Sequence, residues 1–154
     1  MKEIIRLLND KNETISTMES CTGGYIANEI TNIPGSSNVF SFGAVTYSNE
    51  YKIKMGVSKE IIEQFTVYSQ ETAEAMAKTI SNYTNSTYGI GITGKLNTQD
   101  PKNKEGSINK IYIAIYNKKE KTITNAQLDA EETRIKSKEK IYSMIVKLLN
   151  NIIK

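Results

Sequence analysis

Three side chains that could act as nucleophiles stand side by side in the stretch TMESCTGGYIANEI, residues 17–30. Ser20, Cys21 and Thr22 precede a pair of glycines and then a run with the apolar spacing of a helix. The chain contains no histidine. Catalysis by a serine–histidine or cysteine–histidine pair is therefore excluded, because the base of such a pair is missing.

A serine nucleophile in such a chain needs lysine or tyrosine as its base. The segment TYSNEYK, residues 46–52, offers both in Tyr47 and Lys52, directly after a predicted strand. Burial or neighbouring cations can lower a lysine pKa from about 10.4, or a tyrosine pKa from about 10, toward neutrality. The sequence therefore permits a triad with Ser20, and the backbone N–H groups of residues 21–24 could stabilise an oxyanion or bind a phosphate.

Each of these residues also has an ordinary structural interpretation, which the sequence leaves open. A serine at a strand–helix junction is often only a helix N-cap, and a cysteine without a basic neighbour is often a small buried apolar residue. The glycine pair lacks the spacing and the lysine of a P-loop. Tyr47 and Lys52 belong to types that are common on surfaces. Glu19 fits a role in anchoring a loop better than general acid catalysis.

The composition is typical of a folded domain and removes several classes of site. The chain has 154 residues, of which 38% are hydrophobic and 24% charged, which predicts a single domain over 1–154. One cysteine excludes an internal disulfide, and one cysteine without histidine excludes a soft-ligand zinc site. The apolar runs are too short to span a membrane, and residues 1–10 lack a signal-peptide pattern, so we expect a cytoplasmic location and no membrane partner.

The net charge of +3 is spread along the chain rather than gathered in one segment. The densest lysine groups, at 102–104 and 118–121, are diluted by acidic residues in or beside them. This pattern favours an ordinary solvated surface over a nucleic-acid groove. No nucleic-acid partner is therefore predicted.

Hydrophobic periodicity predicts an α/β chain with the element order α-β-α-β-α-α-β-β-β-α. The predicted helices cover residues 3–9, 25–33, 58–65, 69–83 and the chain from 133 to its end, with a helical turn or short helix over 49–56. The predicted strands cover residues 14–18, 39–48, 86–94, 110–117 and 121–130. This order indicates an α/β sandwich of about five strands with helices on both faces. Sites in such folds gather where strands end and helices begin, which is where MESCTGG stands.

Several motifs follow one another in a characteristic order: ESCTGG, PGSS, TYSNE with a following lysine and GV, and TG before GSINKIYIAI. Together they resemble the CinA C-terminal domain family, the nicotinamide-nucleotide amidohydrolases. The resemblance covers nearly the whole chain, from about Ile5 to the last helix. It implies a three-layer α/β/α sandwich with a mixed, five-stranded sheet.

The resemblance implies an activity as well, the hydrolysis of nicotinamide mononucleotide to nicotinate mononucleotide and ammonia. Ser20 matches the nucleophile of the family, and Tyr47 and Lys52 match its catalytic tyrosine and lysine. The implied mechanism is an acyl-enzyme cycle with proton transfer by the lysine and the tyrosine. No metal and no cofactor is expected. The expected substrate-binding residues are Cys21, Thr22, Gly23, Gly24, Thr93, Gly94 and, for the phosphate, Arg134.

The chain departs from the family pattern after the TG motif. Where the family carries a loop rich in glycine and proline, this chain has KLNTQDPKNKEG, residues 95–106. We expect this loop to shape the pocket differently. The resemblance also implies self-association into a homo-oligomer, and the short chain fits the stand-alone form of the domain rather than the form with a large N-terminal domain.

Two other classes of function stay open at the level of sequence. One is a catalytically silent nucleotide-binding or regulatory domain of the same fold, against which the joint presence of Ser20, Tyr47 and Lys52 argues. The other is a partner in competence or DNA damage, supported only by the mild positive charge. Salt-dependent DNA binding would be its test.

Overall fold

The computed structural model describes residues 1–153 and shows helices and strands in nearly the predicted order. The helices are α1 (Lys2–Lys11), α2 (Tyr25–Thr31), α3 (Asn49–Lys54), α4 (Lys59–Phe65), α5 (Gln70–Thr84) and α6 (Arg134–Ile152), with a 3₁₀ helix at Ser36–Asn38. The strands are β1 (Ile15–Glu19), β2 (Gly43–Val45), β3 (Tyr88–Gly94), β4 (Lys110–Asn117) and β5 (Thr122–Asp129).

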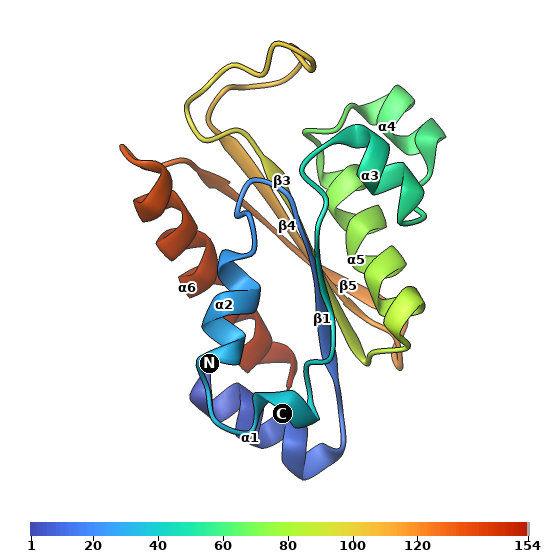
Figure 1. Cartoon of the computed structure of the whole chain (residues 1–154), viewed down its shortest axis with the longest axis vertical. Helices are drawn as coiled ribbons and strands as arrows, with labels where there is room; N and C mark the ends of the chain where they lie inside the picture. Colours follow the sequence, from blue (N-terminus) through green and yellow to red (C-terminus); the bar gives the residue numbers. More distant parts are fainter. Residues whose placement is uncertain (154) are drawn as a thin grey trace.

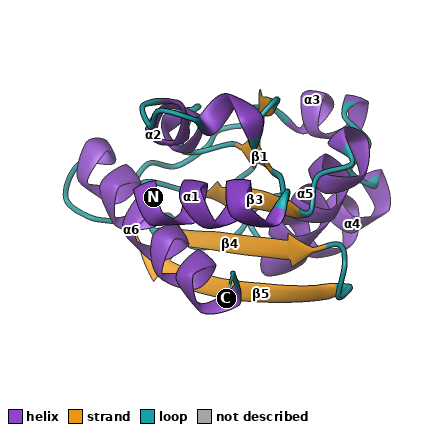
Figure 2. Ribbon diagram, turned by 90° about the horizontal axis from the view of Figure 1, so that it is seen from below, coloured by secondary structure: helices purple, strands orange, loops and turns teal. Residues whose placement is uncertain are grey.

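The strands form one mixed sheet in the order β2-β1-β3-β4-β5, and β1, β3, β4 and β5 can be followed across it in Figure 2. β1 runs parallel to both β2 and β3, whereas β4 is antiparallel to β3 and β5. Helices α1, α2 and α6 cover one face of the sheet, and α3, α4 and α5 lie on the other (Figure 1). The predicted three-layer α/β/α sandwich is confirmed.

The predicted strand over 39–48 is wrong in its length, since only Gly43–Val45 is a strand. β2 is an edge strand and pairs only with the last three residues of β1. Before it, the Ser36 carbonyl closes a turn by accepting from the N–H groups of Val39 and Phe40. After it, the Ser48 hydroxyl caps α3 by accepting from the Tyr51 N–H at 3.2 Å. Local hydrogen bonds therefore limit β2 on both sides, although single backbone hydrogen bonds to β1 remain at Val39 and Thr46.

The remaining boundaries follow the predicted caps closely. Ser58 and Ser69 cap α4 and α5 as expected, and Thr133 is the N-cap of α6 rather than its first residue. The predicted helix from 133 to the end of the chain runs to Ile152, and Lys154 lies outside the described residues. Short polar side chains before apolar periodic runs thus located the helix starts well.

Close packing of α5 on the sheet depends on two glycines of β3. A Cβ atom at Gly89 would collide with the carbonyl oxygen of Ala77, and one at Gly91 would collide with that of Ala73. The helix backbone therefore lies directly against the strand. On the opposite face, isoleucines from β1, β3 and β4 pack against α1, α2 and α6. β1, buried along its whole length, is held between these two layers.

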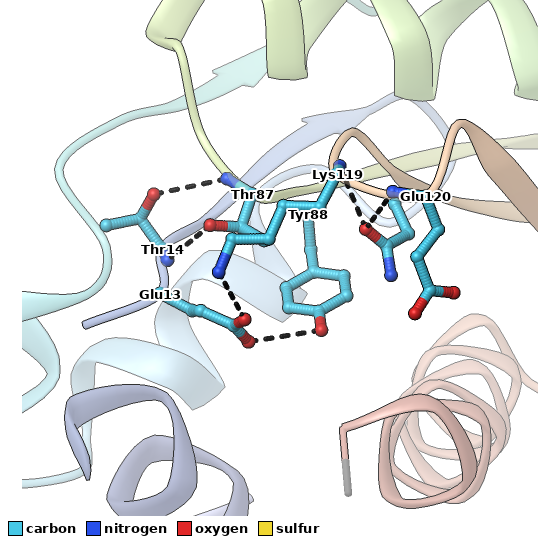
Figure 3. A network of polar contacts seen from close by, with 7 residues as sticks. Glu13, Thr14, Thr87, Tyr88, Lys119 and Glu120 are labelled. Carbon is cyan, nitrogen blue, oxygen red and sulfur yellow. Dashed lines mark hydrogen bonds and ion pairs between the residues drawn. The ribbon is translucent and has the colours of Figure 1, made fainter. Parts of the chain in front are cut away.

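The amino ends of β1 and β3 are joined by a polar network (Figure 3). The Glu13 carboxylate accepts a hydrogen bond from the Tyr88 hydroxyl at 3.1 Å and forms an ion pair with Lys119 at 2.7 Å. Thr14 and Thr87 donate from their backbone N–H groups to each other's hydroxyl. These contacts hold the register of the two central strands at one end, so that their carboxyl ends face each other at the other end.

Within residues 1–153, none of the helices combines the length and the apolar character needed to cross a bilayer.

Candidate active site

Ser20 stands at the carboxyl end of β1, where the chain turns into α2. Its N–H donates to the Ile92 carbonyl at 3.0 Å, which extends the β1–β3 pairing by one residue. The Ser20 carbonyl then accepts from the Gly23 N–H at 3.0 Å. Gly23 and Gly24 both have positive φ, 62° and 93°, which glycine adopts without a steric penalty. The glycine pair therefore makes the sharp turn that leaves Ser20 at the strand end.

Glu19 anchors this turn, as the sequence indicated. Its buried carboxylate accepts hydrogen bonds from the N–H groups of Gly24 at 3.0 Å, Ile26 at 3.2 Å and Ala27 at 2.8 Å. These are the first donors of α2, and a negative charge is favourable at a helix N-terminus. The carboxylate thus occupies the helix N-terminus, where the sequence alone would also allow a phosphate.

The expectation that all N–H groups of residues 21–24 could face an oxyanion needs correction. Gly23 donates to Ser20 and Gly24 donates to Glu19. The turn therefore leaves Cys21 and Thr22 as the backbone donors that could face a developing negative charge.

Lys52 lies directly beside Ser20, although the two residues are far apart in the sequence. Its Nζ is 3.1 Å from the Ser20 Oγ and donates to the Thr46 carbonyl at 2.7 Å. Only 1% of the lysine is exposed. Burial lowers the pKa of Lys52 to about 8, despite the opposing effects of Cys21 and Asp100. A substantial fraction of the lysine is therefore neutral near pH 8, and a neutral amine can accept the serine proton.

Cys21 has the character of a buried apolar residue. Burial raises the pKa of its thiol to about 12, so the thiol stays protonated at neutral pH. Since the thiolate is the reactive form, this environment does not activate Cys21 as a nucleophile. The hydroxyl of Thr22 is also buried and has no hydrogen-bond partner among residues 1–153.

Tyr47 lies in the same region but in a different setting from Lys52. It is 63% exposed, and its hydroxyl accepts a hydrogen bond from the Arg134 guanidinium at 3.2 Å. Tyr47 follows β2 at the sheet edge, and Arg134 opens α6. The structure therefore joins Tyr47 to Arg134 and joins Ser20 to Lys52, and no direct contact of the tyrosine hydroxyl with the serine or the lysine is described.

A cavity of about 550 Å³ opens at this edge of the sheet. Ser20, Cys21, Tyr47, Gly94 and Arg134 are among its lining residues, and Lys52 lies behind Ser20. The volume is in the range of small-molecule sites. The other predicted binding residues, Thr22, Gly23, Gly24 and Thr93, are not among its lining residues. The Thr93 hydroxyl instead donates to the Val67 carbonyl at 2.9 Å.

The cavity also contains residues that the sequence had not singled out, namely Tyr68, Lys95 and Asp100. Lys95 is 3% exposed, donates to the Glu105 carbonyl at 2.7 Å and lies 4.7 Å above the Tyr68 ring. Its position was readable, because it follows β3 at the edge where Ser20 follows β1. Asp100 lies in the divergent loop, whose path no local pattern indicates.

Ligands for a metal ion are sparse in the described part of the chain. No group of three or more cysteine, aspartate or glutamate side chains is arranged there to hold one.

Known proteins resemble this chain in sequence and in fold. A CinA-like protein of Kosmotoga olearia is 34% identical over 142 residues, which cover 92% of this chain and 34% of that protein. The matched segments make up between 22% and 35% of the length of the curated relatives, so the chain corresponds to a part of them.

Solved structures share the fold over almost the whole chain. The competence/damage inducible protein CihA of Agrobacterium tumefaciens is 26% identical with a TM-score of 0.81, covering 96% of this chain and 92% of that one. A CinA superfamily protein of Klebsiella pneumoniae has a TM-score of 0.86 at 19% identity, covering 99% and 94%. The family profile described as the CinA C-terminal domain matches residues 1–153, and this chain therefore belongs to the CinA C-terminal domain family.

Proposed function

We propose that this domain is an amidohydrolase that converts nicotinamide mononucleotide to nicotinate mononucleotide and ammonia, with Ser20 as its nucleophile. The observation that carries the proposal is the contact of 3.1 Å between the Ser20 Oγ and the buried Lys52 Nζ at the wall of a cavity. The chain belongs to the CinA C-terminal domain family, and the nicotinamide-nucleotide amidohydrolase activity that the resemblance to this family implies supports the choice of substrate.

The first half of the reaction forms an acyl-enzyme. Neutral Lys52 takes the proton of Ser20 as the Oγ attacks the carboxamide carbon. The carbonyl oxygen becomes an oxyanion that faces the N–H groups of Cys21 and Thr22, and one such donor is typically worth about 2.7–4 kcal/mol. Protonated Lys52 then gives its proton to the departing nitrogen, the C–N bond breaks, and ammonia leaves.

The second half of the reaction releases the acid. Lys52, neutral again, takes a proton from water as the water oxygen attacks the ester carbon. The second tetrahedral intermediate collapses, the C–O bond to Ser20 breaks, and the serine recovers its proton from the lysine. The product is nicotinate mononucleotide, and the same lysine serves as base and acid in both halves.

Tyr47 and Arg134 are assigned to the substrate rather than to this proton transfer. Their hydrogen bond lies at the cavity lining and is exposed, unlike the buried pair of Ser20 and Lys52. An arginine guanidinium presents several donors and suits a phosphate group. We place the 5′-phosphate of the nucleotide at Arg134, with Tyr47 holding the guanidinium in position.

The test is the release of ammonia and nicotinate mononucleotide by the wild type and by Ser20→Ala at equal folded concentration. The variant should lose about 10³-fold or more of kcat, as enzymes do when the nucleophile is removed. Ser143→Ala is the matched control, because Ser143 is exposed on α6 and donates to the Glu139 carbonyl outside the cavity. It should keep full activity.

Two other outcomes would count against the proposal. Equal turnover by the wild type and Ser20→Ala would exclude the serine nucleophile and turn attention to Cys21. Binding of nicotinamide mononucleotide without turnover by the wild type would favour a catalytically silent nucleotide-binding domain. The divergence of the 95–106 loop from the family pattern is the feature consistent with that alternative.

A further inference from the structure

The divergent loop between β3 and β4 is organised around one carboxylate. Asp100 accepts a hydrogen bond from the Tyr68 hydroxyl at 2.6 Å, from the Asn103 side-chain amide at 2.8 Å and from the Lys102 N–H at 2.9 Å. Lys95 holds the base of the same loop through the Glu105 carbonyl and lies over the Tyr68 ring. The loop therefore has a defined path, although it contains little regular structure.

The loop is also joined to the helix that carries Lys52. The Asn103 side-chain oxygen accepts from the Asn49 side-chain amide at 2.7 Å. Asn49 is the first residue of α3, and Lys52 follows it within the first turn. The loop and α3 lie at the same end of the molecule in Figure 1. A continuous chain of hydrogen bonds thus runs from Tyr68 through Asp100 and Asn103 to the start of α3.

The charge of Asp100 is permanent at working pH. Partial burial raises the pKa of this carboxyl group, but hydrogen bonds from Tyr68, Asn103 and the loop backbone outweigh burial and lower the pKa to about 2. Its negative charge acts on Lys52 and raises the lysine pKa against the larger effect of burial.

Other titratable groups lie near Lys52 at the edge of the sheet where β1 and β3 end. Cys21 after β1 stays a neutral thiol, since burial raises its pKa. Burial likewise raises the pKa of Tyr68, before α5, so its phenol stays neutral. The remaining charged groups at the cavity are Lys95 after β3, Lys102 in the loop, Arg134 on α6 and Glu50 on α3, and Glu50 is paired with Lys54. Asp100 is the carboxylate there that accepts side-chain hydrogen bonds both from Tyr68, before α5, and from Asn103 in its own loop.

We propose that Asp100 is a positioning residue for Lys52. Asp100 orders the 95–106 loop so that the loop docks on the first turn of α3, and it places a fixed negative charge toward the lysine. The role rests on the function proposed above, because it matters to catalysis only if Lys52 is the base. The loop that departs from the family pattern would then contribute to catalysis by positioning Lys52. The negative charge of Asp100 in this loop raises the Lys52 pKa and so offsets part of the lowering that burial causes.

The test uses NMR of protein labelled with ¹³Cε-lysine, in which the Lys52 signal is identified by its absence in Lys52→Met. Asp100→Asn keeps the shape and an acceptor oxygen but removes the charge. The Lys52 pKa should fall in this variant, because the negative charge that raises it is removed. Asp10→Asn is the matched control, because Asp10 pairs with Arg6 on α1 at the far end of the molecule.

A second variant tests the docking and does not depend on removing the carboxylate. Asn49→Ala cuts the link between the loop and α3 but leaves Asp100 in place. Amide hydrogen exchange over residues 95–106 should rise by about fivefold or more, since exchange reports local opening. Asn82→Ala, within α5 and outside the cavity lining, is the control and should leave the exchange of the loop unchanged.

Each result bears on the proposal. A Lys52 pKa that moves equally little in Asp100→Asn and Asp10→Asn would overturn the electrostatic role, and unchanged exchange in Asn49→Ala would overturn the docking. Both measurements work without turnover. A wild type that fails to hydrolyse nicotinamide mononucleotide would therefore refute the proposed function and still leave the Asp100 role decided by NMR.

Discussion

At the scale of single residues, Lys52 shows how a reactive group is obtained without histidine. Its ammonium group is removed from water and donates two hydrogen bonds, one to the Thr46 carbonyl and one to the Ser20 hydroxyl. A pKa lowered from 10.5 to about 8 corresponds to a cost on the order of 3 kcal/mol at neutral pH. The domain is therefore destabilised by Lys52 at the position where the proposed reaction needs a base.

We therefore predict that Lys52→Met stabilises the domain by about 1–2 kcal/mol at pH 7 while abolishing turnover. Removal of the buried charge gives the gain, and the Thr46 carbonyl left without its donor offsets part of it. Between pH 8 and pH 10.5 the unfolded wild type binds more protons than the folded one, so wild-type stability rises with pH. The advantage of the variant should shrink over that interval. Urea unfolding at pH 7 and pH 10 measures both, and a difference independent of pH would contradict the assignment.

At the scale of elements, the turn from β1 into α2 is built by one carboxylate and two glycines. Glu19 receives three backbone hydrogen bonds from the start of α2, and the glycines adopt the left-handed conformation that lets the chain reverse. A helix of seven residues has little stability of its own. The position of Ser20 therefore depends on Glu19 more than on the intrinsic preference of α2.

Glu19→Gln should destabilise the domain by about 1–3 kcal/mol and also reduce activity. The amide keeps one acceptor oxygen but turns an NH₂ group toward backbone donors, which leaves buried groups unsatisfied. Glu29→Gln, on α2 and less buried than Glu19, is the control and should change stability by less than about 0.5 kcal/mol. Thermal or urea unfolding of the two variants makes the comparison. Equal stability would show that the turn holds its shape without the charge.

At the scale of the whole molecule, the two ends of the sheet have different tasks. The carboxyl ends of β1 and β3 lead to Ser20 and Lys95 and to the cavity. The amino ends carry the network of Glu13, Tyr88 and Lys119 (Figure 3). Because this network lies outside the cavity and binds the central strands together, we assign it to stability alone.

Glu13→Ala should therefore lower the free energy of unfolding by about 1–3 kcal/mol, since it leaves the buried Tyr88 hydroxyl without its acceptor. The kcat/KM of the folded protein should stay unchanged. Unfolding curves and kinetics at a temperature where both proteins are fully folded give the two quantities. A loss of kcat/KM under those conditions would show that the two ends of the sheet are coupled.

The sequence by itself determined the features that rest on local patterns. The missing histidine excluded the common triads, and the strand–turn–helix at Ser20 was readable from β-branched residues, glycines and helical spacing. The serine caps of α4 and α5 and the anchoring role of Glu19 were also predicted, because capping and turn formation involve residues close in the chain.

Only the tertiary structure decided which of these residues meet. The order of strands brings Ser20 to Lys52, pairs Tyr47 with Arg134 rather than with that serine, and shortens β2 to the three residues that find partners on β1. The burial that lowers the lysine pKa and the path that brings the 95–106 loop to α3 through Asn103 arise in the same way. These contacts join segments far apart in the chain, and their formation depends on how helices and loops pack around the sheet, which no local pattern records.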